Sequence, residues 1–192
     1  MRAFSDYEST PEFTTAEKLP AGAYVVRIAR AEERDDALCI LFDIAEGEFK
    51  GYFMEKFNDE KKRFPEEAKY KGVYRLWYSK EGDKYYETNK SRMKTVLKII
   101  KEENKLNVDF SKEWDGKALQ GAKVAMIFRG EEYNYMGYHG FNAKPYGVIP
   151  MENYKSGKFT IPEPKRLKAS QSADVDDFTE ASDVSAEEDL PF

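Results

Sequence analysis

Alternation between apolar and polar residues constrains this fold more than any other feature of the sequence. In "YVVRIA" (residues 24–29) every second residue is large and apolar, and the same holds in "LCILFDI" (38–44) for Leu38, Ile40, Phe42 and Ile44. A period of two is typical of strands that bury one face. Only the short charged stretch "RAEERDDA" separates the two runs. The pair therefore predicts a β-hairpin.

The rest of the chain adds three strands and one helix. A third strand is predicted at "VYRLWYS" (73–79), and two more at "AKVAMIFRG" (122–130) and "YGVIPM" (146–151). From Asn89 the period changes, and the apolar positions predict a helix of about 15 residues with lysines on its solvated face. These positions are Met93, Val96, Leu97 and Ile100. Residues 46–72, between the second and third strands, are interpreted as a binding loop or an extra hairpin.

The order β-β-β-α-β-β is that of the OB-fold, a five-stranded Greek-key barrel that binds oligonucleotides and oligosaccharides. We expect a mainly β domain with one helix over residues 19–168, preceded by an arm at 1–18. Residues 169–192 are rich in Ser, Ala and acids and poor in apolar residues. Such a composition buries too little surface to offset the entropy of ordering, so this segment is predicted to be a disordered tail.

Charge is segregated along the chain. Eight of the 36 acidic residues follow Lys168, whereas none of the 31 lysines and arginines does. Residues 1–168 thus hold 28 acids against 31 bases, a net charge of +3, and the tail carries −8. A mildly basic body suits an acidic partner such as nucleic acid.

Several classes of function find no support. One cysteine, Cys39, and one histidine, His139, cannot supply a tetrahedral zinc site. Cys39 lies in an apolar strand, where a buried packing role is expected. We expect no metal, no cofactor and no catalytic residue. No run approaches the roughly 20 apolar residues that span a bilayer, and the start lacks a signal-peptide pattern. The expectation is a cytoplasmic protein without a membrane partner.

Aromatic and basic residues are interleaved in two polar stretches and in the third strand. A binder of single-stranded DNA needs rings on which bases stack and cations for the phosphates. The first stretch supplies Tyr52, Phe53, Lys56, Phe57, Lys62 and Arg63, and the third strand adds Arg75 and Trp77. The second stretch supplies Arg129, Tyr133, Tyr135, Tyr138, Phe141 and Lys144. If Leu76 points inward, Arg75 and Trp77 must point outward, because strand residues alternate between faces.

The last six residues, "EEDLPF", resemble the acidic tip of bacterial single-stranded DNA-binding proteins, which ends in acids, an aliphatic residue, Pro and Phe. In that family the tip docks onto replication, recombination and repair proteins. The resemblance implies that Asp189, Leu190, Pro191 and Phe192 bind such partners, with the ring, the acids and the carboxylate read together.

The body is similar to single-stranded DNA-binding proteins of phages and mobile elements, in "LPAGAYVVRIARAEE", "FDIAEGEFKGYF" and "IPEPKRLK". This resemblance implies a protein that coats and protects single-stranded DNA during replication and recombination in a bacterial host. Residues 46–72 are an insertion relative to the bacterial housekeeping single-stranded DNA-binding protein. The insertion puts in doubt whether this chain forms the tetramer of that protein.

Two alternatives stay open. The chain could recruit replication proteins without binding DNA itself. It could also be a metal-dependent nuclease, because Asp36 followed by Glu48 and Lys50 resembles the acid and Glu-x-Lys arrangement that holds Mg²⁺ in some nucleases.

Overall fold

The computed structural model describes residues 18–135 and 137–167. They form a five-stranded antiparallel open sheet with a few helices, so the expectation of a mainly β protein is confirmed. The predicted arm (1–18, apart from Lys18) and tail (169–192) lie outside the described residues. The strand order is β3-β2-β1-β4-β5.

Strands β1 (Gly22–Arg34) and β2 (Ala37–Ile44) form the predicted hairpin, but the connection is shorter than expected. Most of the charged stretch continues β1, with Arg30, Glu32 and Arg34 on the outer face of the sheet. The turn itself is Asp35–Asp36, both with positive φ (50° and 56°). Positive φ at both central residues is the geometry of two-residue turns whose twist matches that of paired strands.

The predicted third strand and helix are both present. Strand β3 (Val73–Trp77) pairs with β2, and α2 (Tyr86–Asn104) follows it. The helix starts three residues earlier than predicted, and Asn89 does not cap it. Instead the Asn89 side chain donates a hydrogen bond to Ser79 Oγ (2.7 Å). The exposed lysines confirm the predicted solvated face, because Lys90, Lys94, Lys98 and Lys105 are all exposed.

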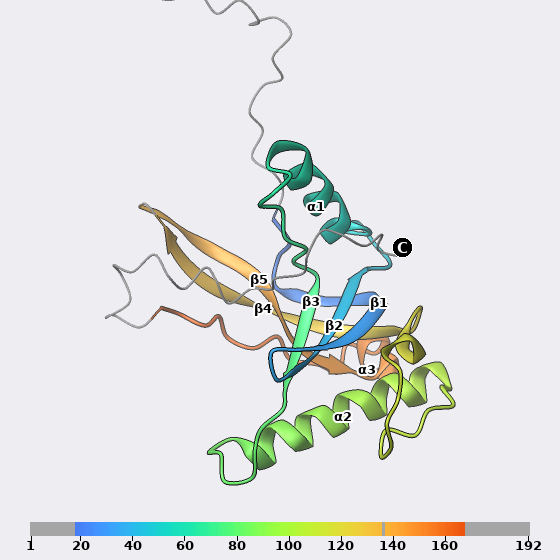
Figure 1. The fold of residues 1–192 in the computed structure, drawn as a ribbon. Coiled ribbons are helices and arrows are strands. Elements are labelled where there is room, and N and C mark those ends of the chain that lie inside the picture. Colours follow the sequence, from blue (N-terminus) through green and yellow to red (C-terminus); the bar gives the residue numbers. More distant parts are fainter. Residues whose placement is uncertain (1–17, 136, 168–192) are drawn as a thin grey trace, which may run out of the picture.

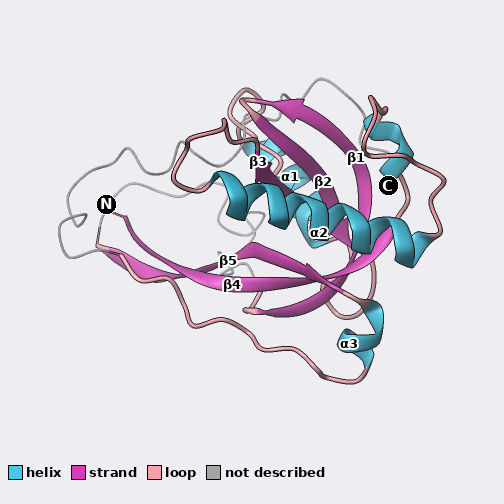
Figure 2. Cartoon of the chain, turned by 90° about the horizontal axis from the view of Figure 1, so that it is seen from below, coloured by secondary structure: helices cyan, strands magenta, loops and turns pink. Residues whose placement is uncertain are grey.

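The last two strands are much longer than predicted. Strand β4 (Lys123–Tyr135) and β5 (Tyr138–Ile149) form one hairpin that takes in the whole ring-rich stretch. A 3₁₀ turn (Gly116–Leu119) precedes β4, and a short helix α3 (Met151–Lys155) follows β5. The tip of the hairpin extends past the ends of the other strands (Figure 1, Figure 2).

Residues 46–72 are neither a loop nor a hairpin, so that interpretation was wrong. They contain α1 (Tyr52–Arg63), which lies at one end of the sheet, while α2 crosses the other end (Figure 1). Asp43 anchors α1, because its carboxylate accepts hydrogen bonds from the N–H groups of Phe53 (3.0 Å) and Met54 (3.1 Å). These are orphan donors of a helix N-terminus, which a side-chain oxygen normally satisfies.

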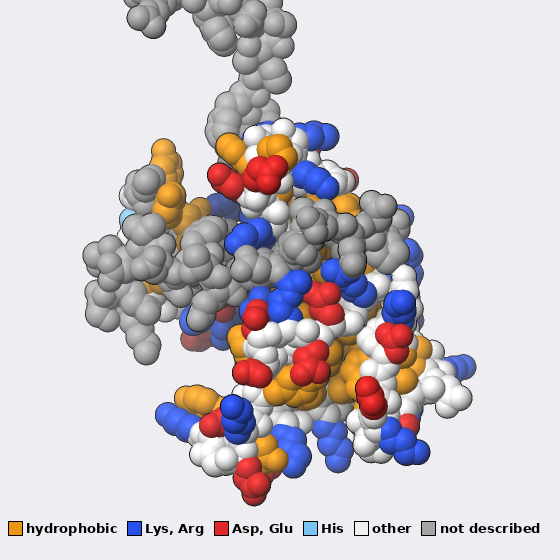
Figure 3. All heavy atoms as spheres, in the orientation of Figure 1, with side chains coloured by type: hydrophobic (Ala, Val, Ile, Leu, Met, Phe, Trp, Pro, Cys, Tyr) orange, Lys and Arg blue, Asp and Glu red, His pale blue; other side chains and the backbone are white. Residues whose placement is uncertain are grey.

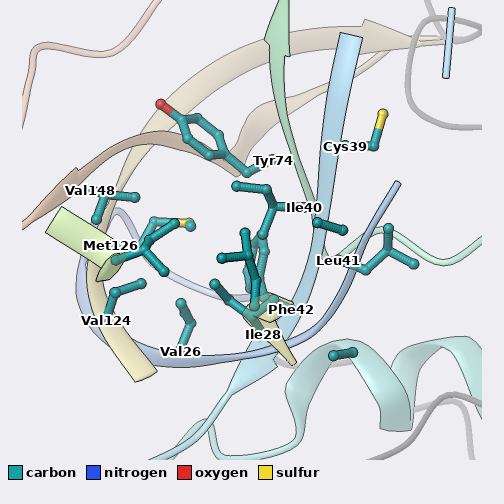
Figure 4. Close-up of a cluster of buried hydrophobic side chains, with 14 of the residues drawn as sticks. Val26, Ile28, Cys39, Ile40, Leu41, Phe42, Tyr74, Val124, Met126 and Val148 are labelled. Carbon is teal, nitrogen blue, oxygen red and sulfur yellow. The ribbon is translucent and has the colours of Figure 1, made fainter. Parts of the chain in front are cut away.

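The core lies on the inner face of the curved sheet. Ile40, Phe42 and Tyr74 point into it with Val26, Ile28 and Met126, whereas Cys39 and Leu41 point the other way (Figure 4). Val96, Leu97 and Ile100 of α2 are buried in the same cluster. Strand β1 is central and pairs with β2 through its second half and with β4 through its first.

Candidate nucleic-acid interface

The outer face of β1, β2 and β3 combines buried apolar side chains of β2 with three arginines. Residues paired across antiparallel strands share a face. The strand register therefore gives three rows across β1, β2 and β3: Arg30, Leu41 and Val73; Glu32, Cys39 and Arg75; Arg34, Ala37 and Trp77. We call these nine residues the arginine face. The β2 members are at most 1% exposed and belong to the buried core cluster.

Trp77 and Arg75 project from β3 as the sequence predicted. Tyr74 and Leu76 between them are each 3% exposed and point into the core, whereas the Trp77 side chain is 49% exposed. The Arg75 guanidinium carbon lies 5.8 Å from the centre of the Trp77 ring. An exposed indole beside a cation offers a stacking surface and a charge for the phosphate of the stacked nucleotide.

Glu32 holds the two arginines of β1 on this face. Its carboxylate lies 3.2 Å from Arg30 and 3.3 Å from Arg34, and all three side chains are about one quarter exposed. Burial raises the pKa of the Cys39 thiol, with the Arg75 charge acting against it. Cys39 is 1% exposed, which confirms its packing role.

The tip half of the β4–β5 hairpin carries the most exposed rings of the second predicted stretch. Tyr138 is 74% exposed, Tyr135 44% and Phe141 41%. Tyr133 is held more closely, because its ring lies over the backbone at Gly140, the residue opposite it in β5. The Lys18 ammonium sits 4.6 Å from the centre of the same ring.

The two bases of this stretch lie nearer the body and are already engaged. Arg129 pairs with Glu131 (2.9 Å), and its guanidinium carbon lies 5.0 Å from the centre of the Tyr146 ring. Lys144 is the cross-strand partner of Arg129, and burial lowers its pKa. Both bases are therefore less free to meet a phosphate than the sequence implied.

Of the three predicted rings of α1, Phe53 is buried, which corrects its assignment to the site, and Tyr52 and Phe57 are partly buried and pack against the core. Phe53 is 6% exposed and contacts the rings of Phe42 and Phe128. Phe57 packs edge-on against Tyr70, at 5.8 Å between ring centres. The Tyr52 hydroxyl accepts a hydrogen bond from the Leu19 N–H (3.1 Å). In a helix, residues four apart share a face, so Phe53 and Phe57 both face the core, with Phe57 partly buried.

The predicted bases of α1 also lie apart from the arginine face. Lys56 sits over the Tyr52 ring (5.3 Å) and Lys62 pairs with Asp59 (3.6 Å), while Arg63 is exposed at the helix end. Because α1 lies at the opposite end of the sheet from α2, these bases do not share a row with Trp77 (Figure 1).

Sequence reasoning missed several residues that lie with the site. Arg34 was assigned to a connection. Tyr78 (42% exposed) follows β3 directly, and Tyr85 (58% exposed) immediately precedes α2. The stretch "WYSKEGDKYY" alternates rings and bases, so the same signal was present there. Arg92 and Tyr146 were also missed. Arg92 donates hydrogen bonds to the Tyr74 hydroxyl (3.2 Å) and to the Tyr146 carbonyl oxygen, and its contact joins α2 to both edge strands.

The residues of the nuclease hypothesis do not come together. Asp36 lies in the turn before β2, whereas Glu48 and Lys50 follow its other end. Eight strand residues at about 3.3 Å each separate them by roughly 26 Å, too far for one metal ion. Within residues 18–135 and 137–167, no cluster of three His, Cys, Asp or Glu side chains could hold a metal. His139 is exposed near the hairpin tip.

Comparison with known proteins assigns no family. No protein-family model matches the sequence, and no curated protein matches it significantly. None of the helices in the described part of the chain combines the length and apolar character needed to cross a membrane.

Proposed function

We propose that this protein binds single-stranded DNA along the arginine face and the β4–β5 hairpin. It would coat and protect exposed strands in replication and recombination. The observation that carries the proposal is the exposed Trp77 ring with Arg75 over it, in one row with Arg34. Sequence-tolerant binding of a single strand needs rings and cations interleaved in this way.

The sheet supports an OB-type barrel for this function. The strand order β3-β2-β1-β4-β5 is that of an OB barrel opened between β3 and β5. Those two edges approach each other, because the Tyr74 hydroxyl lies 3.5 Å from the Tyr146 carbonyl oxygen and Lys71 acts electrostatically on Lys144. A groove of about 560 Å³ lies between these edges and α2.

In such a barrel, the outer face of strands 2 and 3 and the loops beside it form the nucleic-acid site. Here that face is the arginine face, and the long β4–β5 hairpin supplies the flanking rings Tyr135, Tyr138 and Phe141. Bases would stack on Trp77 and the hairpin rings. Arg75 would contact phosphates, whereas Arg30 and Arg34 would first have to exchange their pairing with Glu32 for a phosphate, as Arg129 would with Glu131.

The acidic segment 174–192 would recruit partner proteins through Asp189, Leu190, Pro191 and Phe192. Support for this part is the sequence resemblance, since these residues lie outside the described part of the chain. A recruiting adaptor that does not bind DNA is the alternative, and DNA titration separates the two.

The test uses the two tryptophans of the chain, Trp77 and Trp114. Trp114 packs against Phe110 at 5.0 Å, so only Trp77 should respond to a stacked base. The Trp114→Phe variant should lose fluorescence when oligo-dT is added, whereas the Trp77→Phe variant should not. Trp77→Ala should weaken binding by about 1–3 kcal/mol, the usual contribution of one stacked base.

Oligo-dT should bind more tightly than duplex DNA of equal length, and affinity should fall as salt rises. Equal affinity for the two, or a Trp77→Ala variant that is folded and binds normally, would overturn the proposal. No DNA binding by a chain that still captures replication proteins would favour the adaptor.

A further inference from the structure

We propose that the bound strand continues from Trp77 over residues 78–85 and along the lysine side of α2, defined as Lys90, Lys94, Lys98 and Lys105. This inference rests on the proposed function and extends it, because it gives the strand a direction across the molecule. None of these residues was predicted from the sequence to belong to the site.

Exposed rings continue after Trp77, and two of the rings at the start of α2 are paired with cations. Tyr78 and Tyr85 are 42% and 58% exposed, and the Lys84 ammonium lies 5.2 Å from the centre of the Tyr85 ring. One residue on, the Lys90 ammonium lies 5.0 Å from the centre of the Tyr86 ring. Each pair repeats the arrangement of Arg75 and Trp77, so a base could stack beside a cation at several successive points.

Hydrogen bonds fix this connection between the arginine face and α2. The Tyr78 N–H donates to the carbonyl oxygen of Asp36 in the β1–β2 turn (2.8 Å). Ser79 accepts from Asn89 in the first turns of α2, and the Asp83 carboxylate accepts from the Lys80 N–H (2.8 Å). A connection held at both ends presents its rings with little ordering cost on binding.

Charge favours α2 over α1 as the continuation. Over the whole helices the difference in net charge is small, +2 for α2 against +1 for α1, but residues 90–101 of α2 carry five basic residues and no acid. Lys and Arg side chains gather along α2 at the lower edge of the molecule, with apolar side chains among them (Figure 3). Lysines four residues apart on a helix are spaced about 6 Å along its axis, which gives a regular row of charges for a linear polyanion.

The connection (residues 78–85) has no net charge. It would therefore contribute rings for stacking, whereas α2 would contribute the positive charge that attracts phosphates. Glu81 and Asp83 balance Lys80 and Lys84. An acidic peptide could pair with the lysines, but it has no nucleobases to stack on the rings of Tyr78 and Tyr85. The combination therefore favours a single nucleic-acid strand.

Oligonucleotide length tests the extension. An oligo-dT of about 6 nucleotides should fit on the arginine face, and one of about 20 should reach α2. Tyr85→Ala should weaken binding of the longer strand about fivefold or more and change binding of the shorter one less than twofold. Phe64→Ala is the matched control, because Phe64 is 59% exposed at the opposite end of the sheet.

A charge variant gives an independent measurement. Replacing Lys90, Lys94 and Lys98 by Gln should lower the slope of log affinity against log salt by about 2 for the longer strand only, since each lost phosphate contact removes about 0.7. The control replaces Lys61, Lys62 and Arg63 on α1 by Gln.

Three results would overturn the extension. The first is Tyr85→Ala binding the longer strand as Phe64→Ala does. The second is loss of slope in the α1 variant instead of the α2 variant. The third is an α2 variant that binds DNA normally but loses a synthetic peptide of residues 174–192, which would make α2 a site for the acidic segment. If Trp77→Ala weakens neither strand, the proposed function itself fails.

Discussion

Asp43 has the chemistry of a structural anchor. Among residues 18–135 and 137–167 it is the only charged side chain that is buried, at 4% exposure. Its carboxylate accepts three backbone hydrogen bonds, from Ile44, Phe53 and Met54. Asp43→Ala should cost about 2–4 kcal/mol of unfolding free energy, because two helix N–H groups would be left buried without an acceptor. Urea unfolding measures this, with the exposed Asp59→Ala as control.

The same residue predicts a pH dependence. Burial is the main cause that raises the pKa of Asp43, against the three hydrogen bonds that lower it. A raised folded-state pKa means that the protonated side chain stabilises the fold at low pH, and that this contribution is lost as pH rises through the folded pKa. The unfolding free energy of the parent minus that of Asp43→Asn should therefore be larger near about pH 3 than near about pH 7. A difference that grows with pH would contradict it.

Individual residues show where sequence reasoning works. Trp77 could be placed outward, because a strand alternates and its neighbours Tyr74 and Leu76 had to fill the core. Phe53 could not be placed, since a ring beside lysines reads the same in an exposed loop and on the buried side of a helix. Only the contact with Phe42 and Phe128, which are distant in sequence, decides between the two.

At the scale of elements, strands with one buried face were predicted and those without one were not. The β4–β5 hairpin has no buried period in its tip half, so the stretch 131–142 gave no strand signal. Pairing across the hairpin, including Tyr135 opposite Tyr138, forms it instead. Helix α1 was also missed. Its apolar positions are few, and the acceptor for its N-terminal N–H groups is Asp43, which lies in β2.

Arg92 should be needed to hold the two sheet edges together. It contacts the rings of both Tyr74 and Tyr146, at 5.8 and 5.7 Å, and donates hydrogen bonds to both residues. Arg92→Ala should lower the unfolding free energy by about 1–2 kcal/mol, since the Tyr74 hydroxyl loses its donor. Arg92→Lys should not restore it, because an ammonium lacks the planar fork that reaches two acceptors.

Thermal or urea unfolding of these variants checks the prediction, with Lys94→Ala as a control on the same helix. Weaker DNA binding by Arg92→Ala would show that the edge contact also supports the arginine face. An Arg92→Ala variant as stable as the control would mean that β3 and β5 are held by the core alone.

At the scale of the whole molecule, the segregation of charge links the body to the acidic segment. A body of +3 and a segment of −8 on one chain attract each other, and a segment tethered as the sequence predicts would reach a millimolar effective concentration at the body. Removal of residues 169–192 should therefore strengthen binding of single-stranded DNA, most at low salt, where screening is weak. Unchanged or weaker binding at low ionic strength would count against this competition.

Deletion of Phe192 alone separates charge from recognition. All eight acids remain in that variant, so its DNA binding should match that of the full chain. If Phe192 anchors a partner, its loss removes a ring that typically contributes 2 kcal/mol or more to a small interface, about a thirtyfold drop in affinity. A pull-down of replication proteins followed by titration of any partner found compares the full chain, the chain without 169–192 and the chain without Phe192. If the full chain and the chain without Phe192 bind the partner equally, the acidic side chains alone are enough for binding. The segment would then have an electrostatic role only.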